Sequence, residues 1–192
     1  IIVNSTDNLF INYFAGLALI GIFSNYSMLI ALAGTFILQV FNNLTASIAQ
    51  VNTKESKEKQ FEIFKVINFL NFWIYGAGAI LFVALANDFV QVWIGDDFIL
   101  PTSISIIIAI NFFLVGMQNA VWTFKSTYGL FRYGMWLVVG TAVLNIVLSF
   151  FFGHLYGLFG ILLASAVARM VTNVWYDPFI VFKKGLLQHP VI

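Results

Sequence analysis

One arginine lies inside an apolar segment of this chain, and its position favours a chemical role. Arg169 falls within the apolar run 157–182, whereas the other eight basic residues lie at the ends of such runs. An arginine inside a membrane span costs about 2.5–3.5 kcal/mol on insertion scales unless it faces water or a partner. Its guanidinium suits bidentate contact with phosphate. The alternative is a structural ion pair with Asp7, the acidic residue that can lie well inside a span.

The other polar side chains of the apolar segments recur at spacings of three, four or seven residues. Such residues share one helical face, and a polar face turned to lipid is costly. We therefore expect one hydrated, amide-lined cavity between the helices. Helix packing through hydrogen bonds, worth about 0.6 kcal/mol each on average, is the alternative. The faces comprise Asn4, Asn8 and Asn12; Ser24, Met28, Thr35, Gln39 and Asn42; Asn68, Asn71, Tyr75 and Gly78; Asn111, Gln118 and Lys125; Thr141, Asn145 and Ser149; and Ser165, Arg169, Thr172, Asn173 and Tyr176.

Candidates for substrate binding and for ion coupling come from these segments. The substrate-binding candidates are Arg169, Lys125, Asn111, Gln118, Asn145, Asn173 and Asn25. Asp7 is the candidate for ion coupling or for an ion pair. Lys125 also has a structural interpretation, in which its side chain extends to the membrane interface. Asp177, followed by Pro178, also has a structural interpretation, as the marker of a helix kink.

Enzyme chemistry is weakly supported by the sequence. It contains no HExxH, P-loop or G-x-S-x-G motif and no closely spaced histidine and carboxylate group. A buried catalytic base would have to be Asp7 alone, and a base normally needs a positioned partner. We therefore expect neither an enzyme nor a resident metal or cofactor, with a membrane-bound transferase as the minor alternative.

The composition is that of a membrane protein. Of the 192 residues 61% are hydrophobic and only 9% are charged, and the mean hydropathy is +0.95. Soluble domains are roughly 45–50% apolar and about 25% charged. So little polar surface cannot cover a water-facing shell, so lipid must surround most of the chain. The net charge of +1 gives no indication of nucleic-acid binding, and the lack of cysteine excludes disulfides.

The apolar runs predict an all-α, six-helix transmembrane bundle. A spanning helix needs about 20 mostly apolar residues. Applied along the chain, this length predicts helices at about 1–14, 22–50, 61–86, 102–128, 134–152 and 157–182. A charged connection follows the second helix, and a longer loop, 87–101, follows the third.

The charges predict the orientation of these helices. Lysine and arginine lie at alternate connections, whereas the opposite connections carry only acidic residues or His154. Cytoplasmic loops are enriched in lysine and arginine. We therefore expect the basic connections and the C-terminus in the cytoplasm.

The chain begins with Ile1 and lacks the ordered regions of a signal peptide. We expect it to be a segment of a longer protein that starts partway along a helix.

A series of short motifs runs along the chain. The motifs are Ser5-Thr6-Asp7-Asn8, Gly16, Gly21-Ile22-Phe23-Ser24-Asn25-Tyr26, Asn71-Phe72-Trp73-Ile74-Tyr75-Gly76, Trp93-Ile94-Gly95, Gly129-Leu130-Phe131, Asn145 to Ser149, Gly157-Leu158-Phe159-Gly160-Ile161 and Trp175-Tyr176-Asp177-Pro178. This series resembles the polysaccharide, or lipid-linked oligosaccharide, flippases of the multidrug/oligosaccharidyl-lipid/polysaccharide exporter superfamily. Order and spacing match over nearly the whole chain, and the series is more specific than any single motif. The chain departs at Thr141, where members often carry an acidic residue, and at the connection Arg132-Tyr133-Gly134, which is more charged in members of the family.

The resemblance implies the C-terminal half of a two-bundle, MATE-like transporter, with the N-terminal bundle as its partner. It implies flipping of undecaprenyl-diphosphate-linked oligosaccharide across the bacterial cytoplasmic membrane, for O-antigen, capsule or exopolysaccharide assembly, with polysaccharide polymerase machinery as a further partner. Arg169 and Lys125 would bind the diphosphate, and the amides would bind sugar hydroxyls.

Three alternatives remain open. A cation-coupled multidrug exporter of the same superfamily would need a carboxylate-centred and more apolar cavity, and a peptidoglycan-precursor flippase would need more cavity cations. A non-transporting membrane scaffold would have a dry, packed interior, with Arg169 in a structural ion pair.

Overall fold

The computed structural model describes residues 2–186; the side chains of residues 2–6, 8 and 15 are not part of that description. The described residues are almost all helical and contain no strand, which confirms the all-α prediction. The last element, η3, is a π-helix. The elements are α1 Ile2–Lys54, α2 Lys57–Ile94, η1 Asp96–Phe98, α3 Thr102–Thr127, η2 Leu130–Arg132, α4 Met135–Val171, α5 Asn173–Ile180 and η3 Val181–Leu186.

Four helical stretches are long and apolar enough to cross a membrane. They are Gly16–Lys54, Lys57–Ile94, Thr102–Thr127 and Leu130–Leu186. Many of their large apolar side chains are exposed on the outside of the bundle, among them Phe36, Ile80 and Trp136. Because such a surface is unfavourable in water, the fold has the features of a multi-pass membrane protein.

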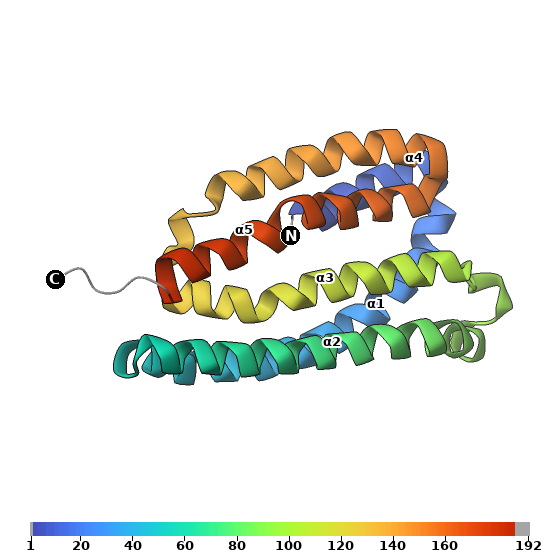
Figure 1. Cartoon of the computed structure of the whole chain (residues 1–192). Helices are drawn as coiled ribbons and strands as arrows, with labels where there is room; N and C mark the ends of the chain where they lie inside the picture. The colour runs from blue at the N-terminus through green and yellow to red at the C-terminus, as the bar shows by residue number, and fades with distance from the viewer. Residues whose placement is uncertain (1, 187–192) are drawn as a thin grey trace.

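Six separate helices are not observed, because two of the predicted boundaries fall inside helices. Gly16 interrupts α1 with a φ of 80°, and Gly157 interrupts α4 with a φ of 56°. Glycine adopts this left-handed region without the steric cost of a Cβ atom. Figure 1 shows that α4 folds back on itself. A one-residue kink thus replaces each of the loops predicted at 14–22 and 152–157.

The predicted loop 87–101 is also too long. Helix α2 continues to Ile94, and Gly95, with a φ of 105°, ends it. Asn87 lies inside α2, and its side chain holds the α2–α3 connection. Its Oδ1 accepts hydrogen bonds from Tyr26 Oη at 2.8 Å and Ser105 Oγ at 3.1 Å, and its amide donates to the carbonyl of Leu100 at 3.3 Å.

Helix α3 is the most buried of the long helices and packs against α1, α2, α4 and α5. The buried apolar side chains form two clusters. One contains Tyr26, Val90 and Ile161, and the other, which includes the end of the described chain, contains Phe124 and Val181. The polar groups between these clusters are therefore held by packing on both sides.

The basic connections meet at one end of the bundle. Figure 1 shows the α1–α2 turn, the α3–α4 connection and the end of η3 at the same end. There Lys57 Nζ donates a hydrogen bond of 2.8 Å to the carbonyl of Gly185, and Lys184 Nζ lies 5.5 Å from the ring centroid of Tyr133. The basic connections that alternate along the sequence thus lie together at one end of the bundle, which we call the basic end.

Candidate functional site

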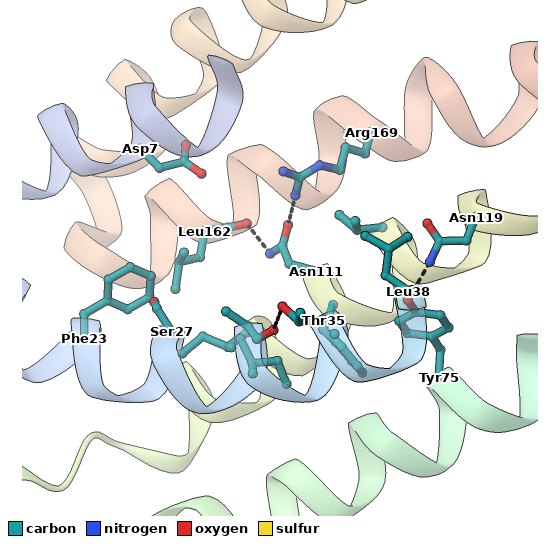
Figure 2. A pocket seen from close by; sticks show the side chains of 16 residues that line it. Asp7, Phe23, Ser27, Thr35, Leu38, Tyr75, Asn111, Asn119, Leu162 and Arg169 are labelled. Atoms are coloured by element: carbon teal, nitrogen blue, oxygen red, sulfur yellow. Dashed lines mark hydrogen bonds between the residues drawn. The ribbon is translucent and has the colours of Figure 1, made fainter. Parts of the chain in front are cut away.

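A cavity of about 470 Å³ lies between α1, α2, α3 and α4. Figure 2 shows side chains from these helices pointing into it. Its apolar wall includes Phe23, Ile108 and Leu162. Its polar wall consists of Asp7, Ser27, Thr35, Tyr75, Asn111, Asn119 and Arg169. The volume is in the range of small-molecule binding sites.

Arg169 is held in the cavity wall by Asn111. The Nη1 atom of Arg169 donates a 2.6 Å hydrogen bond to Oδ1 of Asn111. The amide of Asn111 donates to the carbonyls of Leu162 at 2.9 Å and Ile107 at 3.0 Å. These carbonyls fix the amide group of Asn111, so its oxygen must face the guanidinium. Figure 2 shows the hydrogen bonds of Asn111 with Arg169 and with Leu162.

Asp7 forms a second polar cluster in the same wall. Its Oδ2 accepts a 2.7 Å hydrogen bond from Ser165, and its Oδ1 lies 3.5 Å from Nδ2 of Asn145. The same amide donates to Ser165 Oγ at 2.9 Å. Ser165 and Arg169 are one helical turn apart on α4, and the charges of Asp7 and Arg169 attract each other. The cavity therefore has an acidic and a basic group, each held by amides or hydroxyls.

The Tyr75 ring forms part of the cavity wall. Its hydroxyl accepts a 2.5 Å hydrogen bond from Asn119. A Cβ atom at Gly116 would lie 2.0 Å from the ring, so the ring occupies space that only glycine leaves. Asn71 donates to the carbonyl of Gly116 at 2.9 Å. These contacts hold α2 and α3 close together beside the cavity.

The structure brings together Arg169, Asn111 and Asp7, with Asn145 behind Asp7. The other predicted residues lie away from the cavity wall. Asn173 Oδ1 accepts from Thr141 at 2.8 Å. Gln118 is half-buried, and its Nε2 has no hydrogen-bond partner among the described residues. Asn25 is half-buried on α1.

The side chain of Lys125 does not extend into solvent. It is buried, and its Nζ lies 2.6 Å from Oδ1 of Asp177. Asp177 is therefore an ion-pair partner and more than a mark of the kink at Pro178. The pair joins α3 to α5 at the basic end.

In two of the predicted polar faces, most of the described side chains are exposed. Asn12 is exposed, and Asn4 and Asn8 are among the residues whose side chains are not described. Ser24, Gln39 and Asn42 are exposed on α1, with Thr35 at the cavity edge.

Sequence reasoning missed Ser27 and Asn119 as cavity residues. On α3 the cavity uses Ile108, Phe112, Val115 and Asn119, at spacings of three and four. A search for mixed polar and apolar faces would have found Asn119 on this stripe, next to the predicted face of Asn111 and Gln118.

No protein-family model, curated protein or solved structure matches the chain. Nor do the described residues contain a group of three or more histidine or acidic side chains that could hold a metal ion. The chemistry of the site therefore has to be argued from the cavity residues themselves.

Proposed function

We propose that the chain is part of a transporter that flips an undecaprenyl-diphosphate-linked oligosaccharide across the bacterial cytoplasmic membrane. The observation that carries this proposal is Arg169, an intramembrane guanidinium held by Asn111 in the wall of a cavity. Such a residue is costly within a bilayer, and a bound anion would offset that cost.

The cavity groups suit the two parts of such a lipid. The guanidinium is a planar fork of N–H donors, and the geometry of this fork matches two phosphate oxygens. Ser27, Thr35 and Asn119 offer hydroxyl and amide groups for sugar hydroxyls. Phe23, Leu38 and Leu162 offer apolar contact beside them.

Alternating access would require a second bundle opposite the cavity. The exposed face of α1 carries Ser24, Gln39 and Asn42 within a spanning segment. These amides and hydroxyls would be costly against lipid, so the face suits water or another polar surface. The N-terminal half inferred from the family resemblance would supply that surface, and polysaccharide polymerase machinery would be a further partner. The basic end would face the cytoplasm.

A cation-coupled drug exporter is the second candidate, and Asp7 favours it. Asp7 is buried in the wall of a cavity that also contains Phe23, Ile30 and Phe112. A carboxylate among apolar side chains would suit a lipophilic cation. Under this alternative Asp7, and not Arg169, would bind the cargo.

The test compares Arg169→Gln and Asp7→Asn in proteoliposomes that contain a fluorescent undecaprenyl-diphosphate oligosaccharide. Flipping is followed by quenching of the outer-leaflet fluorophore. We expect Arg169→Gln to lower the flipping rate by at least about tenfold, because a charge-assisted phosphate contact is lost. Arg169→Lys should recover part of the rate, since it keeps the charge but not the planar fork.

Lys59→Gln is the matched control, because Lys59 is exposed and pairs only at the surface with Glu62. Each variant is compared at equal levels of inserted, folded protein. An Arg169→Gln protein that flips the lipid at the normal rate would exclude the proposed role. Loss of export of a cationic dye in Asp7→Asn, with no flipping activity in the parent, would favour the drug exporter.

A further inference from the structure

A second hollow, of about 120 Å³, lies at the basic end of the bundle between α3 and the start of α4. It continues the face of α3 that lines the main cavity, since Trp122 and Ser126 follow Asn119 at intervals of three and seven. Its volume is roughly that of four water molecules in the liquid. The hollow is lined by Trp122, Lys125, Ser126, Phe131, Gly134, Met135 and Val138.

The rim of this hollow faces lipid. Trp122, Phe131, Met135 and Val138 are all exposed large apolar side chains. Arg132 is exposed beside them, at the end of the bundle where the basic residues collect. Tryptophan beside a cation is typical of the level where hydrocarbon meets head groups. A lipid chain can therefore reach the hollow from the bilayer.

Lys125 lines the hollow and forms an ion pair with Asp177 behind it. An added Cβ atom at Gly134 would lie 2.5 Å from Lys125 Nζ and 3.7 Å from Asp177 Oδ1. The backbone of Gly134 thus passes directly over the pair, and no side chain at this position covers it. Gly134 has a φ of 177°, so the restriction here is one of space.

A helix begins at the same place. Gly134 is the N-cap of α4 and provides no side-chain hydrogen bond to the first turn. The first N–H groups of a helix have no partner within the helix and carry its positive dipole end. Three sources of positive potential therefore surround one lipid-facing hollow: Lys125, Arg132 and the start of α4. The carboxylate of Asp177 opposes them.

We propose that this hollow binds the phosphate group of a lipid. Lys125 would share its ammonium between Asp177 and the phosphate, and the N–H groups at the start of α4 would complete the contact, as helix starts do for phosphates. The lipid chain would lie along Trp122, Met135 and Val138. This site does not depend on what the main cavity carries.

Two lipids of the inner leaflet share this chemistry: a bulk phospholipid such as phosphatidylglycerol, and an isoprenoid phosphate. The test uses nanodiscs of phosphatidylcholine that contain either a graded fraction of phosphatidylglycerol or a trace of undecaprenyl phosphate. Because the chain has no cysteine, Val139→Cys takes one environment-sensitive fluorophore beside the hollow. We expect a saturable change with at least one of the two lipids, and the lipid that gives it identifies the source.

Gly134→Ala and Gly140→Ala form the matched pair of variants. The first places a methyl group against Lys125 Nζ, whereas a Cβ atom at Gly140 meets nothing within 4 Å. We expect Gly134→Ala to raise the half-saturating lipid fraction by about tenfold, the effect of losing one charge-assisted contact. Gly140→Ala should leave it unchanged. Equal responses of the two variants would overturn the proposal, as would no response to either lipid.

A second variant guards against misfolding. Lys125→Met/Asp177→Leu removes both charges together, and replacing a buried ion pair by apolar side chains often leaves stability unchanged. We expect the double variant to fold and to lose the saturable response. If it binds either lipid as well as the parent does, Lys125 is not the phosphate ligand and the site is wrong.

Discussion

The guanidinium of Arg169 and the side-chain oxygen of Asn111 lie 2.6 Å apart, across the contact between α4 and α3. The amide of the same Asn111 donates to the carbonyl of Leu162, also on α4. One side chain on α3 therefore contacts α4 at two positions seven residues apart. Asn111 both joins the helices and sets the direction of the arginine in the cavity wall.

Replacing Asn111 by leucine should destabilise the protein by about 1–3 kcal/mol. The change removes a hydrogen bond to a charged donor and leaves the carbonyl of Leu162 without this partner. The thermal midpoint in detergent, followed by circular dichroism, measures the loss. Asn43→Leu is the control, because Asn43 is exposed on α1. Equal midpoints for the two variants would show that Asn111 does not join the helices.

Asp7 and Arg169 should depend on each other energetically. We expect Asp7→Asn to destabilise the parent more than it destabilises Arg169→Gln, because the neutral background has no positive charge left to compensate. A double-mutant cycle of unfolding free energies should give a coupling of about 0.5–3 kcal/mol. A coupling near zero would mean that each charge is satisfied by its own neighbours, Ser165 and Asn145 for Asp7 and Asn111 for Arg169.

The sequence predicts much of the fold because charge and hydrophobicity act locally. Lysine and arginine at alternate connections predict the basic end, and uninterrupted apolar runs predict the long helices. Gly16 and Gly157 are less informative, since glycine is common within spanning helices. Only the packing around Gly157 shows that its φ is positive and that α4 reverses there.

The site was harder to predict, because its contacts join distant residues. The face of Asn111, Gln118 and Lys125 is visible as a repeat of seven. The repeat does not reveal that Asn111 accepts a hydrogen bond from Arg169 or that Lys125 forms an ion pair with Asp177. Nor does it reveal that Nε2 of Gln118 has no hydrogen-bond partner in the described chain. Helix rotation and separation decide these differences, and both depend on packing of all the helices.

Ionisation of the Tyr128 hydroxyl should lower the stability of the fold at high pH. Its hydroxyl donates a 2.7 Å hydrogen bond to Oε1 of Gln60, at the basic end. Burial raises the pKa of Tyr128 to about 12 in the folded protein, above its usual value of 10.0. Because the pKa is higher in the folded than in the unfolded protein, the contribution of neutral Tyr128 to stability is complete below pH 10. It is lost as the pH rises toward 12.

This expectation is tested by the thermal unfolding midpoints of the parent and of Tyr128→Phe between pH 9 and 12. The variant should be less stable at neutral pH, since Gln60 loses a donor, and its midpoint should fall less steeply above pH 10. Tyr156→Phe is the control, because Tyr156 is exposed at the other end of the bundle. Parallel curves for the parent and Tyr128→Phe would contradict the assignment.

The Lys125–Asp177 pair should show a strong contrast between single and double substitutions. Both side chains are buried, with 8% and 3% of their surfaces exposed. Lys125→Met alone would leave Asp177 as an uncompensated buried charge, which costs about 3–5 kcal/mol. Lys125→Met/Asp177→Leu should recover most of that loss. Unfolding in a denaturing detergent measures both, and a double variant as unstable as the single one would show that the pair itself stabilises the fold.

The reversal of α4 should depend on Gly160. A Cβ atom there would lie 1.9 Å from the carbonyl oxygen of Phe152 on the opposing leg of the helix. A backbone atom cannot move aside as a side chain does, so Gly160→Ala must separate the two legs that meet at Gly157. Overpacking costs about 1–3 kcal/mol where side chains can adjust, and we expect a larger loss here.

Gly140→Ala, on the same helix but with no atom within 4 Å of its Cβ position, separates this effect from helix propensity, because alanine should if anything stabilise the helix there. The amount of monodisperse protein in size-exclusion chromatography and its thermal midpoint are the measurements. A Gly160→Ala protein as stable as Gly140→Ala would mean that the legs do not touch at Phe152. The polar groups of Asn145 and Ser165, which face each other across the same two legs at 2.9 Å, would then need a different support.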